Sequence, residues 1–86
     1  YGLARIHWGR GLMTEAARAV VDWGFEHRGL AKVFATADLP NTGSWRVMEK
    51  LGMTREGVLR SEGSLLGQSV DMVYYGLLRE EWEAGR

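Results

Sequence analysis

The stretch TEAARAVVDWGFEHRGLAKVFATADLP, residues 14–40, contains two successive patterns of apolar residues. In residues 14–28 the apolar positions recur at i, i+3, i+4, i+7 and i+8, the spacing of one face of an α-helix. These positions are Ala17, Val20, Val21, Gly24 and Phe25. Gly29 suits the left-handed backbone that ends many helices, and Leu30 would then lie over Phe25. The first pattern therefore predicts a helix over residues 14–28.

The second pattern predicts a strand over residues 31–37. Val33, Ala35 and Ala37 alternate with Lys32, Phe34 and Thr36, a period of two with apolar character on both faces. The strand must end at residues 39–40, because the ring of the proline disfavours helical geometry at the preceding residue.

The rest of the chain predicts a second helix followed by a hairpin. Residues 41–44 (NTGS) offer capping side chains for a helix over residues 42–51, with Val47, Met48 and Leu51 inward and Gly52 as its stop. A β-hairpin over about residues 55–78 would turn around Gly67 and Gln68. Residues 79–82 (REEW) suggest a short polar tail with one aromatic anchor. The fold class is α/β with a mixed sheet, an α+β arrangement that includes a strand end before the first helix.

Composition limits the possible functions. The chain has 86 residues, enough for one domain, and no cysteine, which excludes disulfides and thiolate zinc sites. Two histidines are too few for a histidine-rich cluster, so no metal site is expected. Eleven basic residues balance eleven acidic ones, which argues against nucleic acid as a partner. No apolar run approaches the length of a membrane span, so we expect a cytoplasmic protein with no membrane partner.

Residues 7–16 (HWGRGLMTEA) form a glycine-containing turn that leads directly into the first helix. Backbone N–H groups in such a turn can point at one spot, and the positive end of the helix favours an anion such as a pyrophosphate. Arg10 could add a charged contact. The spacing fits neither the dinucleotide fingerprint nor the Walker A loop. The alternative is that Gly9 and Gly11 form only a tight helix entry.

Two segments together resemble a known family. Residues 8–16 (WGRGLMTEA) are similar to motif A of the GNAT N-acetyltransferases, in the branch that acetylates the N-termini of ribosomal proteins. Residues 41–44, 46–53 and 55–57 (NTGS, RVMEKLGM, REG) are similar to motif B of that branch. The resemblance covers essentially the whole chain. It implies that residues 1–86 form a single partial domain, the C-terminal half of an acyl-CoA N-acyltransferase fold, with motif A at about residues 8–28.

The resemblance also implies roles for individual residues. Acetyl-CoA would be the co-substrate, with its pyrophosphate on the amides of residues 9–14. The implied cofactor-binding residues are Trp8, Gly9, Arg10, Gly11, Leu12, Met13, Thr14 and Asn41. Asn41 would bond the pantetheine arm, and Ser44 would be catalytic, protonating the leaving thiolate. Many relatives use a tyrosine on this helix, where this chain has Met48. The alternative role for Asn41 and Ser44 is helix capping alone.

The implied function is acetyl-CoA-dependent transfer of an acetyl group to a primary amine, either a protein N-terminus or a small amine. His7, Asp38 and Glu62 are possible bases, although for both carboxylates solvation at the surface is the favoured interpretation. Two other functions stay open. The chain could be a truncated CoA-binding module without turnover, or a structural remnant that pairs through exposed sheet edges. We therefore also expect a homodimer, or a complex with a missing N-terminal half.

Overall fold

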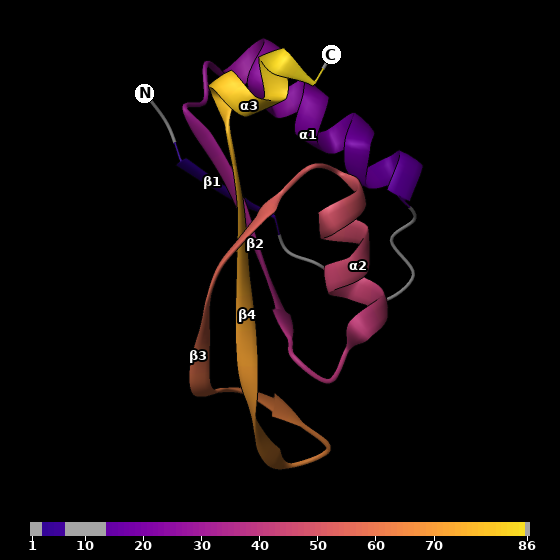
Figure 1. The fold of residues 1–86 in the computed structure, drawn as a ribbon, viewed down its shortest axis with the longest axis vertical. Helices are drawn as coiled ribbons and strands as arrows, with labels where there is room; N and C mark the ends of the chain where they lie inside the picture. The colour runs from indigo at the N-terminus through magenta and orange to yellow at the C-terminus, as the bar shows by residue number, and fades with distance from the viewer. Residues whose placement is uncertain (1–2, 7–13, 86) are drawn as a thin grey trace.

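A computed structural model describes residues 3–6 and 14–85 (Figure 1). The elements are β1 (Leu3–Ile6), α1 (Thr14–Arg28), β2 (Lys32–Asp38), α2 (Thr42–Lys50), β3 (Thr54–Leu65), β4 (Gln68–Leu78) and α3 (Arg79–Ala84). Their order confirms the predicted sequence of a strand end, helix, strand, helix and hairpin. Within the described residues, no helix is both long and apolar enough to cross a bilayer.

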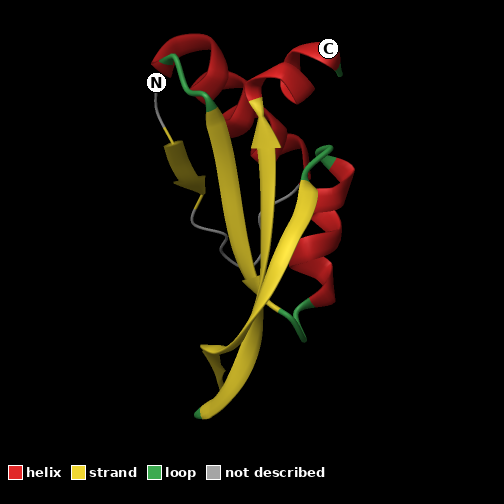
Figure 2. Cartoon of the chain, turned by 60° about the vertical axis from the view of Figure 1, so that its left-hand side comes forward, coloured by secondary structure: helices red, strands yellow, loops and turns green. Residues whose placement is uncertain are grey.

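The four strands form one mixed sheet in the order β1-β2-β4-β3 (Figure 2). β1 pairs with β2 in parallel, from Leu3 opposite Lys32 to Ile6 opposite Ala35. α1 is the crossover between these two strands, as a parallel pair requires. β2 then pairs antiparallel with β4, and β4 pairs antiparallel with β3. β1 and β3 are the outer strands of the described sheet, and pairing of two copies along them stays a prediction.

α1 and α2 lie on the same face of the sheet (Figure 1), where the hydrophobic core forms. β2 contributes the apolar residues that were predicted to alternate along it, and α1 contributes Ala17, Val21 and Phe25. The prediction for Val20 is wrong, because its side chain is 50% exposed. At 3.6 residues per turn Val20 lies roughly 85° from the middle of the buried stripe. The stripe that meets the sheet is therefore narrower than the apolar pattern.

Both helices end at the predicted glycines. Gly29 and Gly52 have φ values of 61° and 86°, in the left-handed region that glycine adopts without strain. Leu30 folds back over the last turns of α1, where a β-carbon added to Gly24 would lie 3.1 Å from its Cδ1 atom. The first pattern thus predicted both the bounds of α1 and its stop signal.

The start of α2 differs from the prediction. Asn41 is the N-cap residue, but its side chain makes no capping hydrogen bond. Its backbone has φ −84° and ψ 71°, outside the extended geometry that aims an N-cap side chain at the first amides of a helix. Backbone bonds hold the turn instead, because the N–H of Asn41 donates to the carbonyl of Asp38 at 2.9 Å. The prediction of side-chain capping is therefore wrong for Asn41.

The hairpin turns one residue earlier than predicted. Leu66 and Gly67 both have positive φ, 52° and 79°, as a two-residue type I′ turn requires. A leucine in this conformation is uncommon, and its side chain is 95% exposed. β3 is also irregular between Leu59 and Gly63, where the N–H of Ser61 donates to Asp71 Oδ1 at 3.0 Å.

The predicted polar tail is wrong, because residues 79–84 form helix α3. Trp82 is buried and stacks on Phe25 of α1, with ring centroids 4.9 Å apart. Its indole N–H donates to Asp22 Oδ1 at 2.7 Å. Arg79 donates to the carbonyls of Phe25 and Leu30 at 2.5 and 2.7 Å, at the end of α1. α3 therefore holds the C-terminal end of α1.

Candidate functional site

The structure describes three of the predicted site residues. Thr14 is the first residue of α1, Asn41 directly precedes α2, and Ser44 lies in the first turn of α2. Trp8, Gly9, Arg10, Gly11, Leu12 and Met13 lie outside the described residues, as does His7. The cofactor-binding role of those residues stays a prediction.

Asn41 and Ser44 are held through their backbones, while their side chains are left uncommitted. The N–H of Ser44 donates to the carbonyl of Asn41 at 3.1 Å. Both side chains are half-buried, and neither makes a hydrogen bond with any described residue. An amide and a hydroxyl with free donors and acceptors therefore lie at the carboxyl end of β2.

Trp45 fixes this end of α2 against the turn before it. Its indole N–H donates to the carbonyl of Leu39 at 3.0 Å. The guanidinium of Arg55, on β3, lies 4.8 Å from the centre of the Trp45 ring, within the range of a cation–π interaction. The residue next to Ser44 thus connects α2 to the turn that follows β2 and to β3.

A second group of polar contacts lies further along α2. We call Glu49, Arg55 and Tyr75 the tyrosine cluster. The buried hydroxyl of Tyr75 donates to Glu49 Oε2 at 2.6 Å, and the Nε of Arg55 donates to that hydroxyl at 3.1 Å. Burial raises the pKa of Tyr75, and the bond to Glu49 adds to this, while Arg55 opposes it. The cluster ties α2 to both strands of the hairpin.

Sequence reasoning missed the tyrosine cluster, because 26 residues separate Glu49 from Tyr75 and no local pattern joins them. A signal existed in the helical spacing, since Glu49 lies one turn after Trp45 on α2. Met48 is fully buried in the core, so the position at which the motif B resemblance implies a tyrosine in many relatives has no proton donor here. Within α2 the hydroxyl groups belong to Thr42 and Ser44.

A groove of about 550 Å³ lies elsewhere, between α1, the end of α2 and α3. Residues from all three helices and β4 line it: Arg18, Asp22, Lys50, Leu51, Gly52, Leu77, Glu81, Trp82 and Gly85. The guanidinium of Arg18 bridges two of these helices by donating to the carbonyl of Lys50 at 3.1 Å. Of the predicted site residues, the three that the structure describes do not line this groove.

The two candidate carboxylates occupy different surroundings. Asp38 is the last residue of β2 and is half-buried. Glu62 lies in the irregular part of β3 and is exposed. Asp38 is thus close in sequence and structure to Asn41. Among residues 3–6 and 14–85, no hydrogen bond or ion pair joins Glu62 to Asn41 or Ser44.

Comparison with known proteins identifies the family. The sequence profile of the acetyltransferase (GNAT) domain matches residues 1–54 of this chain. The chain therefore belongs to the GNAT acetyltransferase family, a family of enzymes, and the resemblance inferred from motifs A and B is confirmed.

Several relatives match over most of the chain. An uncharacterized N-acetyltransferase of Bacillus licheniformis, p20, is 33% identical over 82 residues, which are 95% of this chain and 46% of that protein. The spermidine N(1)-acetyltransferase of Escherichia coli K12 is 37% identical over 60 residues, 70% of this chain and 32% of that protein.

Solved structures agree with the fold. A GNAT-family acetyltransferase from Bacillus anthracis has a TM-score of 0.72 at 39% identity, over 84% of this chain and 43% of that one. The ribosomal-protein-S5-alanine acetyltransferase from Vibrio fischeri has a TM-score of 0.74 at 26% identity, over 86% of this chain and 40% of that one. The chain spans less than half the length of these relatives.

Proposed function

We propose that the protein transfers the acetyl group of acetyl-CoA to a primary amine. The observation that carries this proposal is the pair of half-buried, uncommitted side chains of Asn41 and Ser44 at the carboxyl end of β2. Helix capping would have used these groups, but Asn41 makes no capping bond. In a GNAT-family chain, groups of this kind beside the first turn of α2 suit a polar, amide-containing ligand.

The residues of the chain fit acetyl-CoA in two places. The amides that lead into α1 at Thr14 would hold the pyrophosphate, where the positive end of the helix favours an anion. The side-chain amide of Asn41 can donate and accept at once, which suits the amides of the pantetheine arm. The binding residues proposed upstream of Thr14 are those that the motif A resemblance implies.

The proposed chemistry needs no covalent enzyme intermediate. The nitrogen of the neutral amine attacks the thioester carbonyl carbon, the carbon–sulfur bond breaks, and the nitrogen gives up a proton to solvent. The departing thiolate takes a proton from the hydroxyl of Ser44, which solvent then reprotonates. Positioning of the two reactants supplies much of the rate increase, because the reaction becomes effectively unimolecular.

Names of two relatives support a primary amine as the acceptor. One acts on spermidine, and the other on the alanine of a ribosomal protein. Both acceptor groups are amines that are cationic at neutral pH and must lose a proton before attack. We infer that the acceptor here is of the same class, either a small polyamine or a protein N-terminus.

The test is release of free thiol from acetyl-CoA by the purified protein, with spermidine and with a peptide that begins with alanine. We expect release with at least one of them, and acetylated amine by mass spectrometry. Ser44→Ala should lower kcat by about a hundredfold, as removal of a general acid does, with acetyl-CoA binding unchanged. Thr42→Ala, which removes an exposed hydroxyl of the same turn, is the matched control.

Two results would contradict this proposal. Acetyl-CoA binding without thiol release for either amine would favour the alternative of a CoA-binding module. An unchanged kcat in Ser44→Ala would remove Ser44 from the proposed mechanism.

A further inference from the structure

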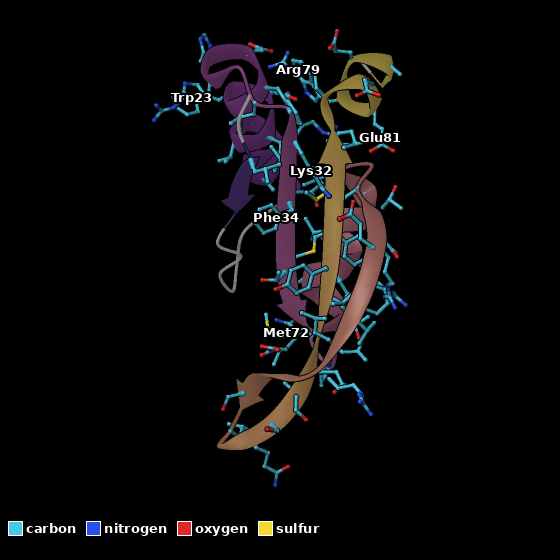
Figure 3. All side chains as sticks on the ribbon, turned by 90° about the vertical axis from the view of Figure 1, so that its left-hand side faces the viewer. Trp23, Lys32, Phe34, Met72, Arg79 and Glu81 are labelled. Atoms are coloured by element: carbon cyan, nitrogen blue, oxygen red, sulfur yellow. The ribbon has the colours of Figure 1, made fainter. Side chains whose placement is uncertain are left out.

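One face of the sheet carries neither α1 nor α2. In the register of β2 and β4, Phe34 lies opposite Gly76, Thr36 opposite Tyr74, and Asp38 opposite Met72, all on this face. Figure 3 looks onto it, with Phe34 and Met72 in front of the strands. The core residues of the same strands alternate with these and point toward the helices. We call this side the open face.

β2 carries two charged residues on the open face, and they differ in their partners. Lys32, at the start of the strand, forms an ion pair with Glu56, with 2.7 Å between Nζ and Oε1. Asp38, at the end of the strand, is half-buried, and its carboxylate has no hydrogen bond or ion pair with any described residue. None of the buried side-chain oxygens in the described residues lacks a partner, so the Asp38 carboxylate is open to solvent and a cationic ligand can reach it.

Gly63 leaves the space that the Asp38 carboxylate occupies. A β-carbon added to Gly63 would overlap Asp38 Oδ1 and would lie 3.0 Å from Met72 Cγ. The φ of Gly63 is not positive, so its backbone alone does not require glycine there. The glycine is therefore needed for space, and the carboxylate lies between β3 and the end of β2.

Asp38 also lies beside the proposed acetyl-transfer site. Its carbonyl accepts the backbone N–H of Asn41 at 2.9 Å. The described pairing of β1 with β2 stops at Ala35, so the last three residues of β2 extend about 10 Å beyond it. A ligand bound by Asn41 and Ser44 on the helix side would thus leave the open face as a separate approach for a second reactant.

We propose that Asp38 binds the ammonium group of the acceptor amine on the open face. This inference rests on the proposed function and extends it to the second substrate. A cationic amine supplies the missing partner of the carboxylate through charge-assisted hydrogen bonds. Phe34, Met72 and Tyr74 offer apolar surface on the same face for the carbon chain of the amine. The acceptor class is therefore a primary amine on an alkyl or peptide chain, positive before reaction.

Two variants test this proposal in different ways. Asp38→Asn removes the charge and keeps the shape, whereas Gly63→Ala keeps Asp38 but fills the space of its carboxylate. We expect both to raise the KM for the amine about tenfold or more, with the dissociation constant for acetyl-CoA unchanged. Glu80→Gln, an exposed carboxylate on α3, is the control for the change in net charge and should match the wild type.

A second readout does not depend on turnover. The carboxyl ¹³C signal of Asp38 should shift on titration with spermidine, or with the peptide that begins with alanine, while that of Glu80 stays constant. An amine KM within twofold of wild type in Asp38→Asn, or an unmoved Asp38 signal with both amines, would overturn the proposal. If Asp38 binds the amine but no thiol is released, the proposed function fails and the amine site stands.

Discussion

At the residue scale, the hydroxyl of Tyr75 holds the helix that carries Asn41 and Ser44 at its start. It lies between Glu49 on α2 and Arg55 on β3, so a single oxygen atom connects a helix to the hairpin. Trp45, which contacts the same Arg55, flanks Ser44. The tyrosine cluster therefore sets the position of the helix whose first turn carries the proposed acetyl-transfer groups.

Removal of that hydroxyl tests the cluster. Tyr75→Phe should lower the free energy of unfolding by about 1 kcal/mol. The loss is small for a hydrogen bond to charged groups, because water can solvate the exposed Glu49 and Arg55 once the hydroxyl is gone. Urea unfolding measures this change. Tyr74→Phe, on the open face with no hydrogen-bond partner among the described residues, is the control. Equal stabilities of the two variants would contradict the role of the cluster.

The pH dependence of the same variant follows from the raised pKa of Tyr75. Burial and the bond to Glu49 raise this pKa above 10.0, so the folded protein holds the phenolic proton more tightly than the unfolded chain does. The resulting stability is fully present below about pH 10 and is lost as the pH rises through the folded-state pKa. Tyr75→Phe should therefore lose less stability than the wild type as the pH rises above about 10.

At the scale of elements, α3 stabilises the end of α1. The guanidinium of Arg79 donates to the carbonyls of Phe25 and Leu30 at that end. The negative end of the helix dipole also favours a cation at this position. Arg79→Lys keeps the charge but loses the planar pair of donors, and should destabilise the fold by about 1–3 kcal/mol. Thermal unfolding beside Arg60→Lys, an exposed arginine on β3, measures the difference. A melting temperature equal to that control would show that the charge alone suffices.

The elements that the sequence predicted are those that local patterns determine. α1 has the predicted bounds because its apolar spacing and Gly29 lie within one continuous segment. α3 was missed because its contacts join residues far apart in sequence, such as Arg79 and Phe25. The tyrosine cluster was missed for the same reason, since 26 residues separate Glu49 from Tyr75. For the site, motif B located Asn41 and Ser44, but only the backbone angles of Asn41 showed that capping does not use its side chain.

At the scale of the whole molecule, the described chain places its proposed site residues on two sides of one sheet. The helix side holds Asn41 and Ser44 at the start of α2, and the open face holds Asp38 at the end of β2. The chain spans less than half the length of its GNAT relatives, 46% for p20. This arrangement would bring a thioester and an amine together from opposite sides at the carboxyl end of β2.

Isothermal titration of the purified protein with acetyl-CoA tests the central claim most directly. The account predicts saturable binding with one molecule per chain, weakened about tenfold in Asn41→Ala through loss of a hydrogen-bonding partner, while adenosine, which lacks the pyrophosphate and pantetheine, binds far more weakly. Circular dichroism of the same samples confirms that each variant is folded. A folded wild-type protein that gives no saturable heat with acetyl-CoA would contradict the account.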